Sequence, residues 1–285
     1  MRLATWNVNS VQARLPRLLG WLDEVRPDVL CLQETKAPDS GFPTAEVGEL
    51  GYQTALYGTG RWNGVAILSR SGLDDVRRGF TAEPGFPDPE ARAISATCAG
   101  CRVWSVYVPN GRAPDSEHYA YKLRWLAALR AAVAEEAGSE TGRRGGLVVT
   151  GDFNIAPTDD DVWDPAAFAD ATHVTPAERA ALAALREVGL RDVVPRPLKY
   201  DRPFTYWDYR AGMFHKNLGM RIDLVYATPA LAETVTDAYV DREARKGKAP
   251  SDHAPVVVDL ATERATERAV DAAQPAHDPV VKPST

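Results

Sequence analysis

Several carboxylate and amide side chains in this sequence stand directly after short apolar runs. Glu34 follows residues 30–32, and Asp152 and Asn154 follow residues 147–149. A charge at the end of an apolar strand is costly unless a partner or a metal ion neutralises it. Carboxylate oxygens are the ligands that Mg²⁺ prefers, and such an ion neutralises a phosphate and activates water. The pattern predicts a Mg²⁺ site suited to phosphodiester hydrolysis, although each acid alone also fits a structural turn.

An aspartate and a histidine form a second candidate pair. Asp223 lies inside the apolar run 222–227, where a carboxylate must find a partner or lose its charge. His253 follows Asp252 just before the last apolar run, and its imidazole could be that partner. A buried aspartate that holds loop backbone is the alternative. The other four histidines have no acidic neighbour at comparable spacing, so we expect them at the solvated surface: His118, His173, His215 and His277.

The elements that must position these groups are visible in the apolar pattern. Residues 3–8 predict a strand, residues 11–25 an amphipathic helix and residues 29–32 a second strand. Further strands are expected at 65–69, 93–97, 102–108, 147–150, 222–227 and 255–260, and helices at 117–136 and 176–188. This alternation predicts an α/β protein in which two packed sheets are flanked by helices.

Length and composition indicate the domain organisation. The 285 residues are 45% hydrophobic and 25% charged, which is typical of a globular protein with a substantial core. We expect one domain over residues 1–260. The apolar stripe ends there, so residues 261–285 are expected to form a disordered tail. The formal net charge of −6 argues against nucleic-acid binding by bulk charge alone, but it allows local basic patches.

Targeting signals and cysteines bear on the compartment. The N-terminal segment lacks the apolar core of a signal peptide, and no apolar run is long enough to span a bilayer. Three cysteines, an odd number, suit a reducing compartment, so we expect a cytoplasmic protein. Cys98 and Cys101 have the spacing of a metal-binding pair, but a second pair at a suitable distance is missing. We expect a tight turn between two strands there.

Six motifs, taken in order, resemble the exonuclease III family (AP endonuclease family 1) of the endonuclease/exonuclease/phosphatase superfamily. They are Trp6-Asn7-Val8-Asn9, Leu32-Gln33-Glu34-Thr35-Lys36, Tyr107-Val108-Pro109-Asn110-Gly111, Gly151-Asp152-Phe153-Asn154, Arg221-Ile222-Asp223 and Ser251-Asp252-His253. The resemblance covers roughly residues 1–260. It implies a four-layer α/β sandwich of the deoxyribonuclease I type, with a single site at the sheet edges.

The resemblance also implies roles for residues of these motifs. The implied metal ligands are Asn7, Glu34 and Asp252, with Mg²⁺ as the ion and Mn²⁺ as its substitute. Asp152 would activate the attacking water or protonate the leaving oxygen, and Asn154 would hold water and phosphate. His253, oriented by Asp223, would donate to a phosphate oxygen, and Tyr107 would contact the phosphate or the leaving group.

Implied substrate contacts lie mostly in later loops. Tyr206, Trp207 and Met220 match positions that line a pocket for an extruded abasic sugar, although Trp207 could equally be a core residue. Arg112 and Arg221 complete the implied substrate-binding set. Other cations near the expected site are candidates for phosphate contacts: Arg61, Lys122, Arg210, Lys216, Lys246 and the basic run 242–248.

The implied substrate is double-stranded DNA with abasic sites or 3′ ends. The resemblance implies a monomeric nuclease of base excision repair that incises abasic sites, degrades DNA from 3′ ends or cleans those ends, in a balance that the motifs leave open. We expect it to be associated with the nucleoid while it acts. Two alternatives remain: a phosphoesterase of the same fold acting on RNA, a nucleotide or a phospholipid head group, and a non-catalytic DNA-binding repair accessory.

Overall fold

The computed structural model describes residues 1–80 and 90–261, and these residues form two six-stranded mixed sheets. The first sheet has the order β11-β12-β1-β2-β4-β3, and the second has the order β5-β6-β7-β8-β10-β9. The first comprises β1 (Arg2–Asn7), β2 (Val29–Gln33), β3 (Gln53–Tyr57), β4 (Val65–Ser69), β11 (Val235–Val240) and β12 (Val256–Leu260). The second comprises β5 (Asp74–Arg78), β6 (Ala93–Cys98), β7 (Cys101–Tyr107), β8 (Leu147–Asp152), β9 (Arg191–Asp192) and β10 (Asp223–Ala227).

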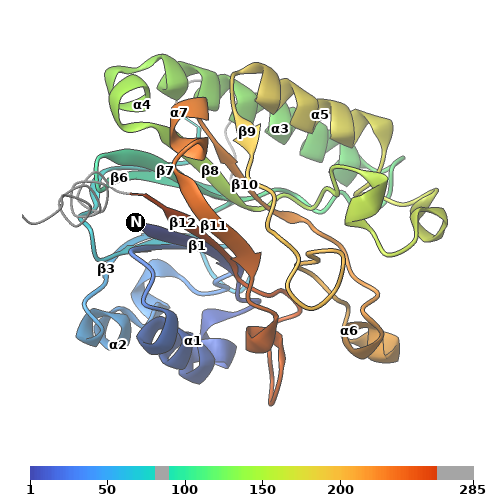
Figure 1. Cartoon of the computed structure of the whole chain (residues 1–285), viewed down its shortest axis with the longest axis horizontal. Helices are drawn as coiled ribbons and strands as arrows, with labels where there is room; N and C mark the ends of the chain where they lie inside the picture. The colour runs from blue at the N-terminus through green and yellow to red at the C-terminus, as the bar shows by residue number, and fades with distance from the viewer. Residues whose placement is uncertain (81–89, 262–285) are drawn as a thin grey trace, which may run out of the picture.

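Helices cover the outer face of each sheet, as Figure 1 shows. The first sheet carries α1 (Val11–Val25) and α2 (Thr44–Glu49), and the second carries α3 (Glu117–Gly138), α4 (Glu140–Gly145) and α5 (Pro176–Glu187). The connections hold α6 (Met213–Lys216), α7 (Pro229–Ala232) and the 3₁₀ helices Asp39–Gly41, Asp159–Asp161, Pro165–Phe168, Arg210–Gly212 and Arg242–Arg245. The predicted four-layer α/β sandwich is therefore confirmed. Within the described ranges, we find no helix that is long and apolar enough to cross a membrane.

Local sequence explains where α5 begins. Thr175 is its N-cap, and the Thr175 hydroxyl accepts a hydrogen bond from the Glu178 amide at 3.2 Å. The Glu178 carboxylate in turn accepts from the Thr175 amide at 3.0 Å, which completes a capping box. Pro176 occupies the first helical position, where its missing N–H costs nothing. The cap also fixes the buried Glu178 carboxylate, which pairs with the Lys122 ammonium of α3.

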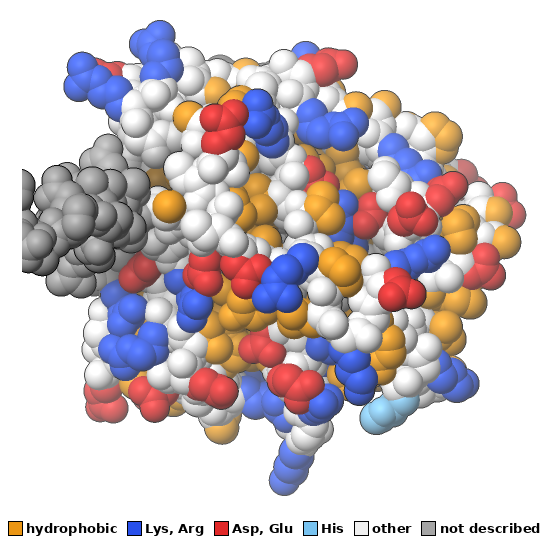
Figure 2. Space-filling model, in the orientation of Figure 1, with side chains coloured by type: hydrophobic (Ala, Val, Ile, Leu, Met, Phe, Trp, Pro, Cys, Tyr) orange, Lys and Arg blue, Asp and Glu red, His pale blue; other side chains and the backbone are white. Residues whose placement is uncertain are grey.

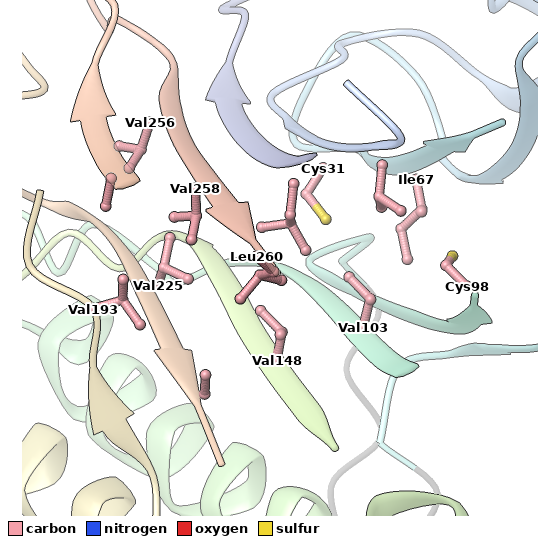
Figure 3. Packing of buried hydrophobic residues seen from close by; sticks show 14 of the residues in the cluster. Cys31, Ile67, Cys98, Val103, Val148, Val193, Val225, Val256, Val258 and Leu260 are labelled. Carbon is pink, nitrogen blue, oxygen red and sulfur yellow. The ribbon is translucent and has the colours of Figure 1, made fainter. Parts of the chain in front are cut away.

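Alternate residues of the central strands face two different cores. In β1, Leu3 packs between the sheets, whereas Ala4 and Trp6 pack toward α1. In β8, Val148 packs between the sheets and Val149 packs toward α3. Figure 3 shows the layer between the sheets, where apolar side chains from both sheets meet. This period of two follows from the pleat, and burial on both faces explains why these strands are so apolar.

The layer between the sheets changes from apolar to polar along four central strands. The inward-facing series are Leu3-Thr5-Asn7 in β1, Cys31-Gln33 in β2, Val103-Ser105-Tyr107 in β7 and Val148-Thr150-Asp152 in β8. Strands β1 and β2 are parallel, as are β7 and β8, so their carboxyl ends lie together. The Gln33 amide spans the layer, donating to Thr5 Oγ1 at 3.0 Å and to Ser105 Oγ at 3.1 Å. The layer between the sheets is therefore polar at the edge where the carboxyl ends of these four strands meet; we call it the polar edge.

Four strands were not predicted from the sequence: β3, β5, β9 and β11. They are the edge strands of the two sheets. All five residues of β5 are exposed, and β9 has only two residues. An edge strand has a single neighbour and does not need a continuous apolar run, so the apolar pattern does not mark it.

The two remaining sequence expectations concern a turn and the C-terminus. Ala99 and Gly100, both with positive φ, join β6 to β7, and Cys98 pairs directly with Cys101. The predicted tight turn is confirmed. The expected tail falls almost entirely at 262–285, outside the described residues, so its disorder and the domain limit at residue 260 stay predictions.

Gly151, the residue before Asp152 in β8, allows the close approach of β7. A Cβ there would lie 2.0 Å from the backbone oxygen of Val106. We therefore expect Gly151→Ala to force the strands apart and to lower the free energy of unfolding by about 3 kcal/mol. Urea denaturation measures this loss. The control is Gly20→Ala in α1, whose added Cβ meets nothing within 4 Å; an equal loss in both variants would contradict the argument.

Candidate active site

Asp152 lies at the centre of the polar edge. In the register of the second sheet it stands between Tyr107 of β7 and Asp223 of β10. Asp152 Oδ1 accepts a hydrogen bond from the Asn154 amide at 2.9 Å, and Oδ2 accepts one from Asn7 Nδ2, also at 2.9 Å. Four of the predicted catalytic and metal residues are thus in contact with, or in register beside, this single carboxylate.

The Asn7 side chain joins carboxylates that come from opposite sheets. Its Nδ2 donates to Glu34 Oε1 and to Asp152 Oδ2, each at 2.9 Å. Glu34 Oε2 forms an ion pair with Lys36 Nζ at 2.8 Å. Burial opposes the Glu34 charge, but the Lys36 charge and hydrogen bonds from Lys36 and Asn7 hold the pKa of Glu34 below its ordinary value. Glu34 is therefore an anion held beside Asp152.

His253 and Asp223 form a buried pair. His253 Nδ1 lies 2.7 Å from Asp223 Oδ2, and His253 Nε2 lies 3.8 Å from Asp152 Oδ2. Burial opposes the imidazolium, but the two aspartates raise the pKa of His253 to about 10. Burial raises the pKa of Asp152 to about 7, although the His253 charge opposes this rise. The geometry thus places a cationic N–H donor next to a carboxyl group that exchanges its proton near neutral pH.

Tyr107 adds a phenol to the same edge. Burial raises the pKa of Tyr107 well above its ordinary value, and the charges of Glu34 and Asp152 add to the rise. The phenol therefore stays protonated and can donate. The Arg92 guanidinium lies 4.7 Å from the centre of the Tyr107 ring, and Arg92 Nη1 donates to the Tyr107 carbonyl at 3.3 Å. The sequence did not single out Arg92, because a lone arginine before a strand has no distinguishing signal.

The acids supply ligand atoms that could hold a metal ion. A carboxylate oxygen of Asp152 and one of Asp223 lie within 4.8 Å of each other and of a His253 ring nitrogen, and while His253 is protonated only the two carboxylates can act as ligands. Asp223 Oδ1 is buried and has no hydrogen-bond partner, so it offers a free lone pair. Asp252, beside His253, accepts from Asn9 Nδ2 at 3.0 Å. Hard oxygen donors of this kind suit a divalent cation that prefers oxygen, so the residues present fit such an ion.

A cavity of about 300 Å³ opens beside these residues. Its lining includes Arg112, Tyr206 and Met220, three of the five predicted substrate contacts, together with Asn110 and His173. The Tyr206 ring lies 4.9 Å from the His253 ring, so the cavity wall contacts the His253–Asp223 pair. The cavity with these three predicted substrate contacts is therefore adjacent to the polar edge.

Two of the predicted substrate contacts lie elsewhere. Trp207 is only 1% exposed and packs edge-on against Phe214, so the core alternative is correct for it. Arg221 is 2% exposed and is bound by Asp161 at 2.6 Å and by Asp192 at 3.0 Å. Its donors are used by these aspartates, so the structure contradicts a direct substrate contact by Arg221.

Lys122, expected to contact phosphate, is instead fully buried. Its ammonium pairs with Glu178 Oε1 at 2.5 Å and donates to the backbone oxygens of Asn154 at 2.7 Å and Asn110 at 3.1 Å. The expectation is wrong because the capping box of α5 presents an acid at this point. The helices α3 and α5 thereby fix the two loops whose asparagines face the site.

His173 also departs from its expected place at the solvated surface. Its Nδ1 lies 2.6 Å from the Asn154 carbonyl oxygen, and the side chain lines the cavity. Burial and the Lys122 charge lower the pKa of His173 to about 4, so the ring is neutral at physiological pH. Sequence pattern could not predict this burial, because Asn154 and Lys122 are distant from His173 along the chain. His215 is exposed as expected, and His277 lies outside the described residues.

Most cations of the basic run 242–248 are engaged in contacts within the protein. Arg242 lies 3.9 Å above the Phe214 ring and donates to the Phe214 carbonyl, and Arg245 is 6% exposed beside Tyr209. Lys246 pairs with Glu243 at 2.6 Å. In the view of Figure 2, cationic and anionic side chains are interspersed. Arg61, Arg112 and Lys216 are exposed and remain candidates for phosphate contacts.

Comparisons with known proteins agree with this geometry. The model of the Endonuclease/Exonuclease/phosphatase family matches residues 4–253. An exodeoxyribonuclease III of Haemophilus influenzae is 30% identical over 269 residues, covering 90% of this chain and 98% of its own. A solved 3′-5′ exonuclease (NExo) from Neisseria meningitidis is 42% identical with a TM-score of 0.85, covering 91% and 99% of the two chains. An AP endonuclease from Archaeoglobus fulgidus is 38% identical with a TM-score of 0.85, covering 92% and 100%.

Two packed sheets with an acid-rich site at one edge define a phosphodiester hydrolase of the two-sheet nuclease class. The chain belongs to the exonuclease III family within the endonuclease/exonuclease/phosphatase superfamily. It is accordingly an enzyme of a DNA-repair nuclease family.

The buried pair Lys122–Glu178 can be tested by removing one charge or both. Lys122→Met leaves the Glu178 carboxylate buried without a cation, so we expect a loss of about 3–5 kcal/mol in the free energy of unfolding. The double variant Lys122→Met, Glu178→Gln removes both charges and should lose clearly less. Urea unfolding of the wild type, the single variant and the double variant measures these losses. Equal losses in the two variants would show that the unpaired Glu178 charge is not the cause of the destabilisation.

The His253–Asp223 pair should make stability depend on pH in the metal-free protein. The pKa of His253 is about 10 when folded and 6.5 ordinarily, so the folded state binds an extra proton. This contribution is complete below pH 6.5 and is lost as the pH rises toward 10. We expect Asp223→Asn to abolish most of that decline. Urea unfolding in EDTA between pH 6.5 and 10 measures it, and an unchanged slope in the variant would contradict the assignment.

Proposed function

We propose that this chain is a Mg²⁺-dependent nuclease of base excision repair that hydrolyses phosphodiesters of double-stranded DNA at 3′ ends and at abasic sites. One observation carries the proposal: an anion held by Asn7, a cationic His253 donor and a carboxyl group with a pKa near 7 converge beside a cavity. Hydrolysis of a phosphodiester needs these groups together.

The proposed roles follow from protonation and position. A divalent cation held by Glu34 and neighbouring acids would neutralise the phosphate and polarise its oxygens. Asp152 accepts a proton from the attacking water or returns one to the leaving oxygen, because its pKa lies near neutrality. His253 donates from Nε2 to a phosphate oxygen, while Asp223 keeps its ring oriented and charged. The Tyr107 phenol donates to the phosphate or to the leaving oxygen.

The choice of Mg²⁺ and of DNA rests on chemistry and on relatives. Mg²⁺ binds through one or two carboxylates and completes its shell with water and phosphate oxygens, which suits an open edge of this kind; Mn²⁺ would substitute. The relatives' names describe an exodeoxyribonuclease, a 3′-5′ exonuclease and an AP endonuclease, and a Neisseria NExo structure contains a product DNA hairpin. A monomer would suffice, since all proposed catalytic groups come from one chain.

The decisive experiment compares two substrates and two variants. Purified protein is incubated with end-labelled duplex carrying an internal abasic analogue, or with intact duplex, in Mg²⁺ or in EDTA. We expect one EDTA-sensitive cut beside the lesion and a ladder of shortened products from the 3′ end. Glu34→Ala and Asp152→Asn should lower turnover by at least about a hundredfold while remaining folded.

Several outcomes would overturn this proposal. Absence of cleavage by the wild-type protein in Mg²⁺ would favour a non-catalytic accessory. Weak turnover of both duplexes beside rapid turnover of RNA or a nucleotide would favour a phosphoesterase of another specificity. The matched control is Glu135→Ala, which removes an exposed carboxylate of α3 next to Glu136, and Glu136 binds Arg102 at the end of β7 opposite Tyr107; this variant should keep full activity.

A further inference from the structure

Trp62 is the one tryptophan with a mostly exposed side chain in the described part of the chain. It is 70% exposed, whereas Trp6, Trp21, Trp104, Trp125 and Trp207 are at most 6% exposed and Trp163 is half-buried. A single exposed apolar residue is normal on a protein surface. Trp62 differs because the chain around it is tied to the catalytic edge at several points.

The loop that carries Trp62 connects β3 to β4 and is anchored on both sides. At its start, the Gly58 amide donates to Asp39 Oδ1 at 2.7 Å, and Thr59 forms a β-bridge with Pro38. At its end, the Lys36 amide donates to the Asn63 carbonyl at 2.9 Å, and the Thr35 amide donates to the Gly64 carbonyl at 3.1 Å. The residues free of these ties are those of the tip, 60–62.

Gly64 makes the attachment rigid. Its own amide donates to the Ala91 carbonyl at 2.9 Å, and its φ is +94°. A Cβ there would lie 2.1 Å from Thr35 Oγ1, so only glycine allows this approach. The residues that bind Gly64 and Asn63, namely Thr35 and Lys36, directly follow Glu34. An exposed indole therefore extends from a short tip whose base is anchored to the segment directly after Glu34, with the exposed Arg61 next to it.

We propose that Trp62 is a stacking platform for an unpaired or frayed base at a DNA 3′ end, which makes it a residue that selects open ends. This role rests on the proposed function, because it assumes a DNA substrate. Aromatic side chains stack on any base whose face is exposed, independent of sequence. In continuous duplex the base faces are covered by their neighbours, and the faces that an internal abasic site uncovers lie inside the helix rather than at an open end. Arg61 would contact the adjoining phosphate without reading sequence.

The binding test uses the quenching of tryptophan fluorescence by acrylamide, a neutral molecule that reaches exposed indoles. The protein is Asp152→Asn, which keeps the substrate intact, with and without Trp62→Phe. One DNA is a duplex with two unpaired nucleotides at a 3′ end, and the other is a dumbbell closed at both ends with an internal abasic analogue. We expect the open-ended DNA to protect the emission of Asp152→Asn from quenching, the dumbbell to leave it unprotected, and Trp62→Phe to remove the difference.

A kinetic test separates stacking from folding. Because stacking acts on bound substrate and transition state alike, we expect Trp62→Ala to raise KM for the open-ended duplex by about tenfold and to leave kcat unchanged. Cleavage of the dumbbell should stay as in the wild type. Trp62→Phe, which can still stack, should rescue KM. The control Leu198→Ala removes a comparable exposed apolar side chain, 56% exposed, and should change neither constant.

The outcomes distinguish failure of the Trp62 stacking role from failure of the proposed function. Fluorescence polarisation of labelled DNA reports binding independently of Trp62. Binding of the open-ended DNA with unchanged quenching, or an equal rise of KM for both substrates, would overturn the stacking role and leave the proposed function intact. If neither the open-ended DNA nor the dumbbell binds, the proposed function and the stacking role are both overturned.

Discussion

The structure depends on the contact between the carboxyl ends of the central strands of two sheets. Between the sheets, packing is apolar for most of the strand length and becomes polar only over the last two or three residues. A buried polar group is tolerable where it finds a partner, and here the partner comes from the opposite sheet. The Asn7 amide, with one N–H on Glu34 and the other on Asp152, is such a link. The same bonds that close the sandwich therefore assemble the site.

Electrostatic balance at this edge comes from a few fixed cations. Lys36 pairs with Glu34, and the His253 ring lies between Asp223 and Asp152. These two cations do not compensate all the carboxylates, and Asp223 keeps one oxygen without a donor. A divalent cation would relieve this repulsion. The crowding of carboxylates therefore both favours metal binding and contributes to the raised pKa of Asp152.

The central strands and the acids that meet at their carboxyl ends could be predicted because both leave local marks in the sequence. A strand buried on two faces must be apolar throughout, and an acid directly after it is conspicuous, as with Glu34 and Asp152. The edge strands leave no such mark, since β5 is exposed along its whole length. Nor do partners that meet only in space: Lys122 and Arg221 look like free cations until Glu178, Asp161 and Asp192 are seen beside them. Residue type and position along the chain thus predict the acids at this edge better than they predict which cations lie free beside it.

The stacked arginines have a consequence for how substrate is met. Arg242 on Phe214 and Arg245 beside Tyr209 hold two long connections that contain little regular structure. Segments of this kind normally lose conformational entropy when a ligand orders them, and affinity falls accordingly. Here the arginine contacts order the two connections when the protein folds, so their conformation is set before substrate binds. On the proposed function, a surface of fixed shape would bind a duplex that bends readily at a lower cost than a stiff one.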